Sequence, residues 1–330
     1  MASLQGISVV IPNYNGKDLL PQVLPCAVAA LENTGLIYEI IVVDDASQDD
    51  SIAVLQKEFS KVKVLQNEQN SGFSVTANKG IYAAQFDWVL LLNSDVKLEP
   101  GYFAALLKYT TYPGLFAVMG RIIGWNDEII QDGAKYPFFH GVKIKTSGNY
   151  LLKDEASMKD GLLSMYVSGA NMFLNKTVFI KIGGFNEMFS PFYVEDFELS
   201  LRAWRLGYTC YYEHFAVCRH RTSTTIASSH KKKKVNIIYN RNKMYLHAIH
   251  LEAPKRYIWF LQLFAEAFFR LLTLNTGYAR SVSLFLGHYR EVRRKRNEIK
   301  KLAQPGKPAS VKEIADTIKS KLDEQNIIRF

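Results

Sequence analysis

The stretch YEIIVVDDAS (residues 38–47) decides the expected fold, because a short aliphatic run ends directly in two aspartates. Three other short apolar runs resemble it: ISVVI (7–11), VKVL (62–65) and DWVLLL (87–92). The segments between the four runs have helical character, over residues 19–31, 51–59 and 74–84. This alternation predicts an α/β protein whose mostly parallel sheet carries helices on both faces.

Polar residues follow three of these strands where each ends. They form the segments PNYN (12–15), DDAS (44–47) and NSD (93–95). In a parallel sheet such ends line the ligand crevice, so they predict acceptors for a nucleoside and oxygen ligands for a hard cation. Helix caps and turns explain any one segment equally well.

Phosphate recognition needs a separate explanation, because two familiar glycine-rich motifs are absent. No G-x-G-x-x-G follows the first strand, and no G-x-x-x-x-G-K-[ST] occurs anywhere. Mg²⁺ typically takes one or two carboxylates and completes its shell with substrate phosphates and water. Asp95 is therefore the predicted metal carboxylate.

Composition places the chain among globular proteins, since 330 residues with 48% hydrophobic content bury a sizeable core. The three cysteines, Cys26, Cys210 and Cys218, suit neither a disulfide framework nor a zinc site. The beginning, MASLQGISVVIPNYNG, has no positive region before its short apolar run and predicts a first strand instead of a signal peptide. We expect a cytoplasmic protein.

The formal charge of +10 is divided unevenly along the chain. Residues 1–230 hold 19 Lys and Arg against 23 Asp and Glu, whereas residues 231–330 hold 22 against 8. We therefore expect a boundary near residue 230. Beyond it, we expect residues 231–330 to form a basic helical extension that associates with membranes.

Two adjacent carboxylates, Glu195 and Asp196, precede a segment of helical spacing in FSPFYVEDFELSLRAWRLGY (189–208). Acidic residues in a first helical turn complement the helix dipole, so a capping role alone accounts for them. Glu198 and Arg202 have the i,i+4 spacing of an ion pair on the helix face opposite the apolar residues. Gly207 marks the expected end of the helix.

The order of motifs resembles that of an inverting family 2 glycosyltransferase of the rhamnosyltransferase-like branch, with the GT-A nucleotide-sugar-binding fold. The resemblance covers roughly residues 6–245 and rests on VVIPNYNG, IIVVDDASQDDS, NSGFSVTANKG, LLNSDVKLEPG, VSGANMFLNKTVFIKIGGFNEMFSPFYVEDFELSLRAWRLGY, HRTST and YNRNK. Single motifs are weak signals, but their shared order makes a chance match improbable.

The resemblance implies a GT-A catalytic domain over 1–230, with a donor-binding half over about 1–100 and an acceptor-side half over about 101–230. Carried over by position, it also implies a donor site for a nucleotide-diphosphate sugar. Its implied members are Pro12, Tyr14, Asn15 and Asp45 around the nucleoside, Asp44 close behind it, and Asn93, Ser94 and Asp95 in place of the family's D-x-D metal motif. One carboxylate of that motif is missing here. His220 matches a position that approaches the metal, Mg²⁺ or Mn²⁺, in relatives.

Asp196 aligns with the family's catalytic base and Glu195 with its acidic neighbour. In an inverting transfer the acceptor hydroxyl attacks the anomeric carbon opposite the leaving diphosphate, and a carboxylate removes its proton. A helix N-terminus fixes such a carboxylate in place, so capping and catalysis coexist.

The segment YIWFLQLFAEAFFRLLTL (257–274) is long enough to cross a bilayer, but Gln262, Glu266 and Arg270 interrupt it along one helical stripe. We expect that stripe to face water on a helix lying at an anionic membrane surface, at the inner face of the membrane. A spanning helix and a helix packed on the catalytic domain are the alternatives. Such a location suits a glycan or lipid-linked acceptor in cell-surface polysaccharide synthesis.

Two other functions remain open at this stage. A non-catalytic nucleotide-sugar-binding protein would use the same donor site. A nucleic-acid-binding protein would use the basic tail, although no zinc finger, helix-turn-helix or RNP signature accompanies it.

Overall fold

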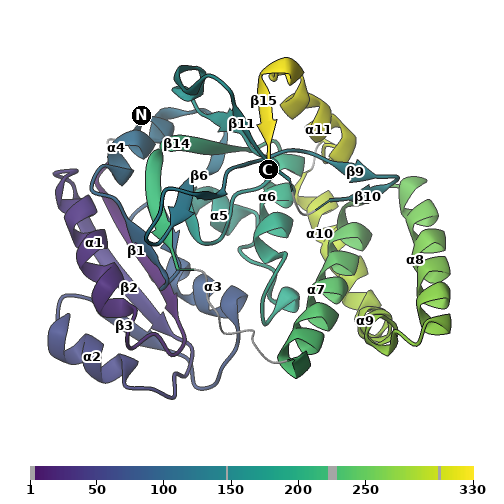
Figure 1. The fold of residues 1–330 in the computed structure, drawn as a ribbon, viewed down its shortest axis with the longest axis horizontal. Helices are drawn as coiled ribbons and strands as arrows, with labels where there is room; N and C mark the ends of the chain where they lie inside the picture. Colours follow the sequence, from purple (N-terminus) through teal and green to yellow (C-terminus); the bar gives the residue numbers. More distant parts are fainter. Residues whose placement is uncertain (1–3, 146–147, 222–228, 304–305) are drawn as a thin grey trace.

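The computed structural model describes residues 4–145, 148–221, 229–303 and 306–330, and its fold is a mixed α/β layer with a helical group on one side (Figure 1). The strands are β1 (Gly6–Asn13), β2 (Ile37–Asp44), β3 (Lys63–Gln66), β4 (Trp88–Leu92), β5 (Val96–Leu98), β6 (Leu115–Gly124), β7 (Ile130–Asp132), β8 (Ala134–Lys135), β9 (Phe139–His140), β10 (Lys143–Ile144), β11 (Asn149–Leu152), β12 (Leu162–Leu163), β13 (Asn171–Asn175), β14 (Thr209–His220) and β15 (Ile327–Arg329). The helices are α1 (Leu20–Glu32), α2 (Ser51–Glu58), α3 (Phe73–Ala83), α4 (Tyr102–Leu106), α5 (Lys176–Lys181), α6 (Glu195–Arg205), α7 (Ser229–His250), α8 (Lys255–Leu272), α9 (Thr276–Gly287), α10 (Tyr289–Leu302) and α11 (Val311–Lys319).

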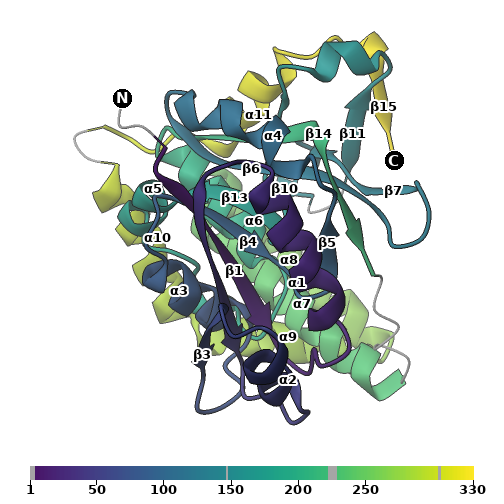
Figure 2. The same cartoon turned by 90° about the vertical axis from the view of Figure 1, so that its left-hand side faces the viewer.

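The predicted alternation of strands and helices over the first hundred residues is confirmed. β1 pairs in parallel with both β2 and β4, and β2 pairs in parallel with β3. Val9, Val10, Ile41 and Val42 have no exposed surface, because α1 and α3 pack on opposite faces of these strands (Figure 2). The carboxyl ends of β1, β2 and β4 therefore meet at one edge of the sheet.

Beyond β4 the sheet changes direction, in the order β4-β13-β6-β14. β13 is antiparallel to β4, so its first residue, Asn171, lies opposite Leu92 at the end of β4. β5 pairs with the far end of β14 and sets His220 opposite Val96. This arrangement brings residues from four distant parts of the chain to the same edge.

Helix α6 begins at Glu195 as the sequence predicts, and Gly207 follows its end at a φ of 88°. Glu198 and Arg202 form the predicted i,i+4 ion pair, with Arg202 Nη2 2.7 Å from Glu198 Oε2. They do not face water, however: both are buried, because His250 of α7 lies over them with its Nε2 3.3 Å from Glu198 Oε1.

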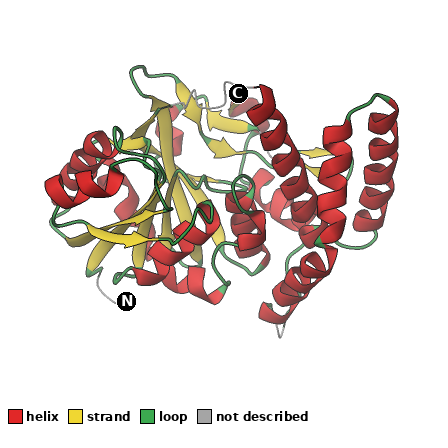
Figure 3. Cartoon of the chain, turned by 90° about the horizontal axis from the view of Figure 1, so that it is seen from below, coloured by secondary structure: helices red, strands yellow, loops and turns green. Residues whose placement is uncertain are grey.

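The chain after residue 230 packs on the earlier part and shares its core. One hydrophobic cluster includes Phe197 and Trp204 of α6 together with Leu246, Trp259 and Ile314. The C-terminal strand β15 pairs with β11. Figure 3 shows the C-terminal helices gathered beside the sheet. The division at residue 230 therefore stays a proposal about the functions of the two parts of the chain.

Helix α8 lies on the outside of this helical group, and its polar stripe faces water only in part. Two of the three stripe residues are exposed as expected, whereas Glu266 is half-buried. Trp259 and Leu263 are buried on its inner side. Glu266 lies on that same side by helical spacing and pairs with Lys143 of β10 at 2.5 Å. Across the described ranges, none of the helices combines the length and apolarity that a bilayer crossing requires.

Candidate active site

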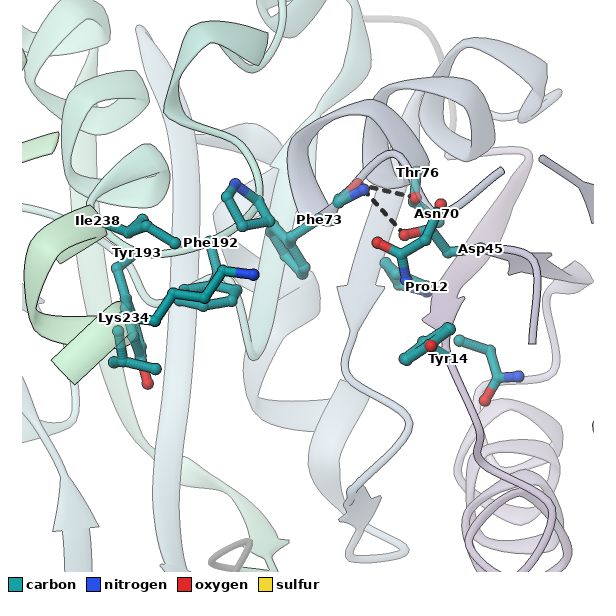
Figure 4. Close-up of a pocket in the computed structure, with 14 residues that line it drawn as sticks. Pro12, Tyr14, Asp45, Asn70, Phe73, Thr76, Phe192, Tyr193, Lys234 and Ile238 are labelled. Atoms are coloured by element: carbon teal, nitrogen blue, oxygen red, sulfur yellow. Dashed lines mark hydrogen bonds between the residues drawn. The ribbon is translucent and has the colours of Figure 1, made fainter. Parts of the chain in front are cut away.

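A cavity of about 670 Å³ opens at the carboxyl ends of β1 and β2 (Figure 4). One wall contains Pro12, Tyr14 and Asp45, three of the residues implied as donor ligands. The opposite wall comes from residues that the sequence did not indicate. These are Pro191, Phe192 and Tyr193 before α6, and Lys234, Val235 and Ile238 of α7.

Asp45 is buried at the back of this cavity, and the loop before α3 fixes its carboxylate. Oδ1 accepts hydrogen bonds from Asn67 Nδ2 and the Ser71 N–H, both at 2.8 Å, and Oδ2 accepts one from the Gly72 N–H at 2.9 Å. A carboxylate has about four acceptor positions, so Oδ2 retains one for a ligand. A base imide N–H is a suitable donor for it.

Asp44 lies behind the cavity with no exposed surface, and its Oδ1 accepts from Asn13 Nδ2 at 2.8 Å. Asn15 does not line the cavity, contrary to the expectation. Its φ of 54° turns it toward α2, where its Oδ1 accepts from the Gln48 N–H at 2.7 Å. Asp44 and Asn15 therefore shape the loop after β1 and do not face the cavity.

Asp95 and His220 meet at the junction of β5 and β14. His220 Nε2 lies 3.5 Å from Asp95 Oδ2, and His220 Nδ1 lies 3.0 Å from Gln131 Oε1. Asp95 Oδ1 is buried and has no hydrogen-bond partner in the described part of the chain. Residues 222–224 of the HRTST motif lie outside that part. A carboxylate with an unpartnered oxygen, close to an imidazole nitrogen, is a suitable ligand set for a divalent cation.

Asn93 and Ser94 form the turn that delivers Asp95. The Val96 N–H donates to the Asn93 carbonyl at 3.1 Å, and the Asn93 N–H donates to the Ala170 carbonyl at 2.9 Å. The described residues contain no group of three or more His, Cys, Asp or Glu side chains arranged around a metal. Any cation held here would complete its shell with substrate oxygens and water.

Asp196 stands at the first turn of α6 and is partly exposed. Its Oδ2 accepts from the Gly169 N–H at 3.2 Å and its Oδ1 from the Phe197 N–H at 2.7 Å. Glu195 is buried, and its Oε2 has no partner within the described ranges. Both carboxylates thus occupy the helix N-terminus, and Asp196 alone reaches toward the edge of the sheet.

The two carboxylates differ in how easily they ionise. Burial raises the pKa of Glu195 well above its ordinary value, and the adjacent Asp196 raises it further. Burial also raises the pKa of Asp196, but the N–H groups of Gly169 and Phe197 and the charge of Lys135 oppose that rise. The pair therefore favours a neutral Glu195 beside an ionised Asp196.

Gly169 and Ala170 join the two parts of the site. Gly169 holds Asp196, and Ala170 accepts from Asn93 two residues before Asp95. A Cβ at position 169 would lie 3.1 Å from the ring of Phe73, so a larger residue there would have to displace that ring by a few tenths of an ångström. The motif VSGAN thus ties the proposed base to the proposed metal carboxylate.

The loop before α6 is held by α7 through Asn242, which is fully buried. Its Nδ2 lies 2.6, 3.0 and 2.8 Å from the carbonyl oxygens of Phe189, Phe192 and Tyr193. Tyr193 and Val194 adopt left-handed φ angles of 75° and 74°. In the sequence, Asn242 belongs to the motif YNRNK, but the motif alone does not indicate that this side chain binds the loop.

The first half of the chain is similar in sequence to a recognised enzyme family. The profile described as "Glycosyl transferase family 2" matches residues 8–183. An undecaprenyl-phosphate 4-deoxy-4-formamido-L-arabinose transferase from Edwardsiella ictaluri (strain 93-146) is 34% identical over 110 residues, which are 32% of this chain and 34% of that protein. The putative teichuronic acid biosynthesis glycosyltransferase TuaG of Bacillus subtilis (strain 168) is 34% identical over 106 residues, 31% of this chain and 41% of that one. The chain thus spans about a third to two fifths of the length of these two curated relatives.

Solved structures with the same fold have low sequence identity. GalNAc-T7, crystallised with UDP, GalNAc and Mn²⁺, superposes with a TM-score of 0.63 at 16% identity and covers 97% of this chain and 58% of its own. The mannosyltransferase PcManGT of Pyrobaculum calidifontis, in complex with GDP-Man and Mn²⁺, superposes with a TM-score of 0.51 at 15% identity, covering 90% and 85%. They support the GT-A fold. Because the family profile matches more than half of its length, this chain belongs to glycosyl transferase family 2.

Proposed function

We propose that this glycosyltransferase transfers a sugar, with inversion, from a nucleotide-diphosphate sugar to an acceptor hydroxyl. The observation that carries the proposal is the shared edge of the sheet. Gly169 and Ala170 connect Asp196 on one side to the turn bearing Asp95 on the other. The cavity containing Asp45 opens at the carboxyl ends of the neighbouring strands.

In the proposed reaction the acceptor oxygen forms a bond to the anomeric carbon while the bond from that carbon to the diphosphate oxygen breaks. The acceptor proton passes to a carboxylate oxygen of Asp196, and the electron pair of the broken bond stays on the diphosphate. The Gly169 N–H fixes the orientation of Asp196 Oδ2. Burial raises the pKa of Glu195, which opposes a second negative charge at the acceptor side.

The donor's nucleoside occupies the cavity between the β1 loop and α7. Tyr14 and Tyr193 are both partly exposed there, and such aromatic rings offer flat surfaces to a base or ribose. The remaining acceptor position of Asp45 selects a base that presents an N–H.

A divalent metal, Mg²⁺ or Mn²⁺, would be held by Asp95 Oδ1 and His220 Nε2, and when bound it supplies positive charge to the departing diphosphate. The buried, unpartnered Oδ1 supports this assignment. Two similar folds were solved with Mn²⁺. Because Asn93 stands where relatives have a first aspartate, affinity for the free ion is expected to be modest.

The proposed acceptor is a lipid-linked glycan, and the proposed location is cytoplasmic and peripheral at the inner face of the membrane. The curated relatives named as undecaprenyl-phosphate transferases support a lipid-linked acceptor. The excess of Lys and Arg after residue 230 supports attachment to an anionic surface.

The test is a direct assay of transfer. The full chain is incubated with UDP-, GDP- or dTDP-sugars, Mn²⁺ and a polyprenyl-phosphate or glycolipid acceptor, and the product's anomeric configuration is read by NMR. Metal-dependent product with the configuration opposite to that of the donor is expected. Donor binding without turnover by any donor and acceptor, or a product that retains configuration, would contradict the proposal.

A further inference from the structure

The side of helix α8 that faces away from the protein is entirely apolar. Helical spacing sets nine side chains on it, and all of them are exposed; we call this set the outer face of α8: Tyr257, Ile258, Leu261, Phe264, Ala265, Phe268, Phe269, Leu271 and Leu272. Leu261 and Phe268 are 73% and 60% exposed. Figure 1 shows α8 at the margin of the molecule. A continuous apolar surface of this kind marks an interaction site.

Two charged residues of the same helix, Glu266 and Arg270, make contacts with neighbouring elements. Lys143 of β10 and Arg270 both pair with Glu266, at 2.5 and 2.9 Å. The guanidinium of Arg270 also lies 4.5 Å from the ring centroid of Tyr278 on α9. These contacts fix the rotation of α8 about its own axis, so its apolar outer face is a stable feature of the fold.

A basic cavity lies at the C-terminal end of α8, on the side of Arg270. It has a volume of about 440 Å³ and lies between α7, α8 and the start of α9. Lys232, Lys233 and Arg270 line it together with Asn236, Asn240 and Asn275. Neither lysine forms an ion pair with the residues that the structure describes. Ammonium, guanidinium and amide donors in one cavity match the oxygens of a phosphate.

We propose that the outer face of α8 docks on an anionic phospholipid surface. Its aromatic and aliphatic side chains enter the boundary between headgroups and acyl chains, and Lys232 and Lys233 lie at the level of the headgroup phosphates. This inference rests on the proposed peripheral location and deepens it by naming the helix face and the lysines that carry it. It does not depend on the proposed reaction, because the surface is formed without donor or acceptor.

Charge distinguishes this partner from a second copy of the chain. Residues 231–330 hold 22 Lys and Arg against 8 Asp and Glu. A symmetric dimer through α8 would bring two such basic regions together, and like charges oppose association. An anionic bilayer instead matches both the apolar face and its basic border.

Vesicle flotation of the full chain tests the proposal. Vesicles of phosphatidylcholine alone are compared with vesicles that also contain phosphatidylglycerol, and the variant Leu261→Glu/Phe268→Glu is compared with wild type. A matched control, Ile129→Glu/Ile180→Glu, adds the same charge at exposed apolar positions elsewhere, which are 70% and 50% exposed. Circular dichroism establishes that each variant is folded.

Wild type and the control are expected to float with anionic vesicles and to bind the neutral ones more weakly. The α8 variant should bind at least tenfold more weakly, because it loses two exposed apolar side chains that enter the bilayer on binding. Lys232→Gln/Lys233→Gln should lower binding to anionic vesicles by about fivefold per lysine while leaving binding to neutral vesicles unchanged.

Two results would overturn the proposal. One is equal flotation of wild type and a folded α8 variant. The other is a dimer, seen by analytical ultracentrifugation, that the α8 variant dissociates while wild type does not float with either vesicle. Vesicle binding requires no donor, so a failure here is separable from a failure of the proposed reaction.

Discussion

Asn242→Ala tests whether α7 holds the loop that leads to the proposed base. The side chain is fully buried, and its two N–H hydrogens serve three carbonyl oxygens at 2.6 to 3.0 Å. Removing them leaves the buried carbonyl of Phe189 and the partly buried carbonyls of Phe192 and Tyr193 without this donor. An unpaired buried group costs about 1–3 kcal/mol, and a partly buried one costs less. We therefore expect the free energy of unfolding to fall by about 2–4 kcal/mol.

The same substitution should affect turnover, because the loop contains two residues in left-handed conformations, Tyr193 and Val194. Such conformations cost about 1–3 kcal/mol each and persist only when their surroundings enforce them. Without Asn242 the loop relaxes and displaces the start of α6. A displacement of about 1 Å at a reacting group lowers kcat by roughly a hundredfold.

The assay combines chemical denaturation with steady-state kinetics, and Asn236→Ala is the matched control. Asn236 lies on the same helix but is exposed, so its replacement should change stability by less than about 0.5 kcal/mol. If Asn242→Ala remained within that same range and retained kcat within about twofold of wild type, the reasoning would be refuted.

Three further predictions concern the site itself. Asp45→Asn should weaken donor binding by at least about tenfold, measured by calorimetry, because its carboxylate organises the loop of residues 67–72 and accepts from the base; an unchanged Kd would argue against the nucleoside pocket. Asp95→Ala should raise the Mn²⁺ concentration needed for half-maximal activity more than about tenfold. It should also weaken Mn²⁺ binding in the presence of nucleoside diphosphate, measured by electron paramagnetic resonance, and unchanged binding would contradict the metal assignment. Lys135→Met should move the acid limb of the kcat/KM profile to higher pH, because the charge of Lys135 lowers the pKa of Asp196 and the base is active only when ionised. A shift to lower pH would contradict this electrostatic effect of Lys135.

Strand and helix patterns in the sequence predict the first half of this fold well, because buried parallel strands such as β1 and β2 are continuous apolar runs with polar residues at their ends. The same pattern brings Asp45 and Asp95 to one edge of the sheet. The i,i+4 pair of Glu198 and Arg202 is also predicted, but its burial is not. That burial depends on His250, 52 residues away along the chain.

The second wall of the donor cavity could not be predicted from local pattern. Lys234 and Ile238 belong to a helix that returns to the sheet edge from the far side, and only tertiary packing places them opposite Tyr14. The orientation of α8 is a similar case. Its periodicity identifies an apolar face, but the contact of Glu266 with Lys143 decides which face is turned outward.

The central claim is that Asp196 removes the acceptor's proton and takes no part in holding the donor. Asp196→Asn keeps the shape of the side chain and its contact with the helix while removing the basic oxygen. The decisive measurement compares, in this one variant, single-turnover rate and donor Kd. We predict a rate lower by about 10²–10⁴-fold with a Kd within about twofold of wild type. A rate close to that of wild type, with the variant folded and donor bound, would contradict the account.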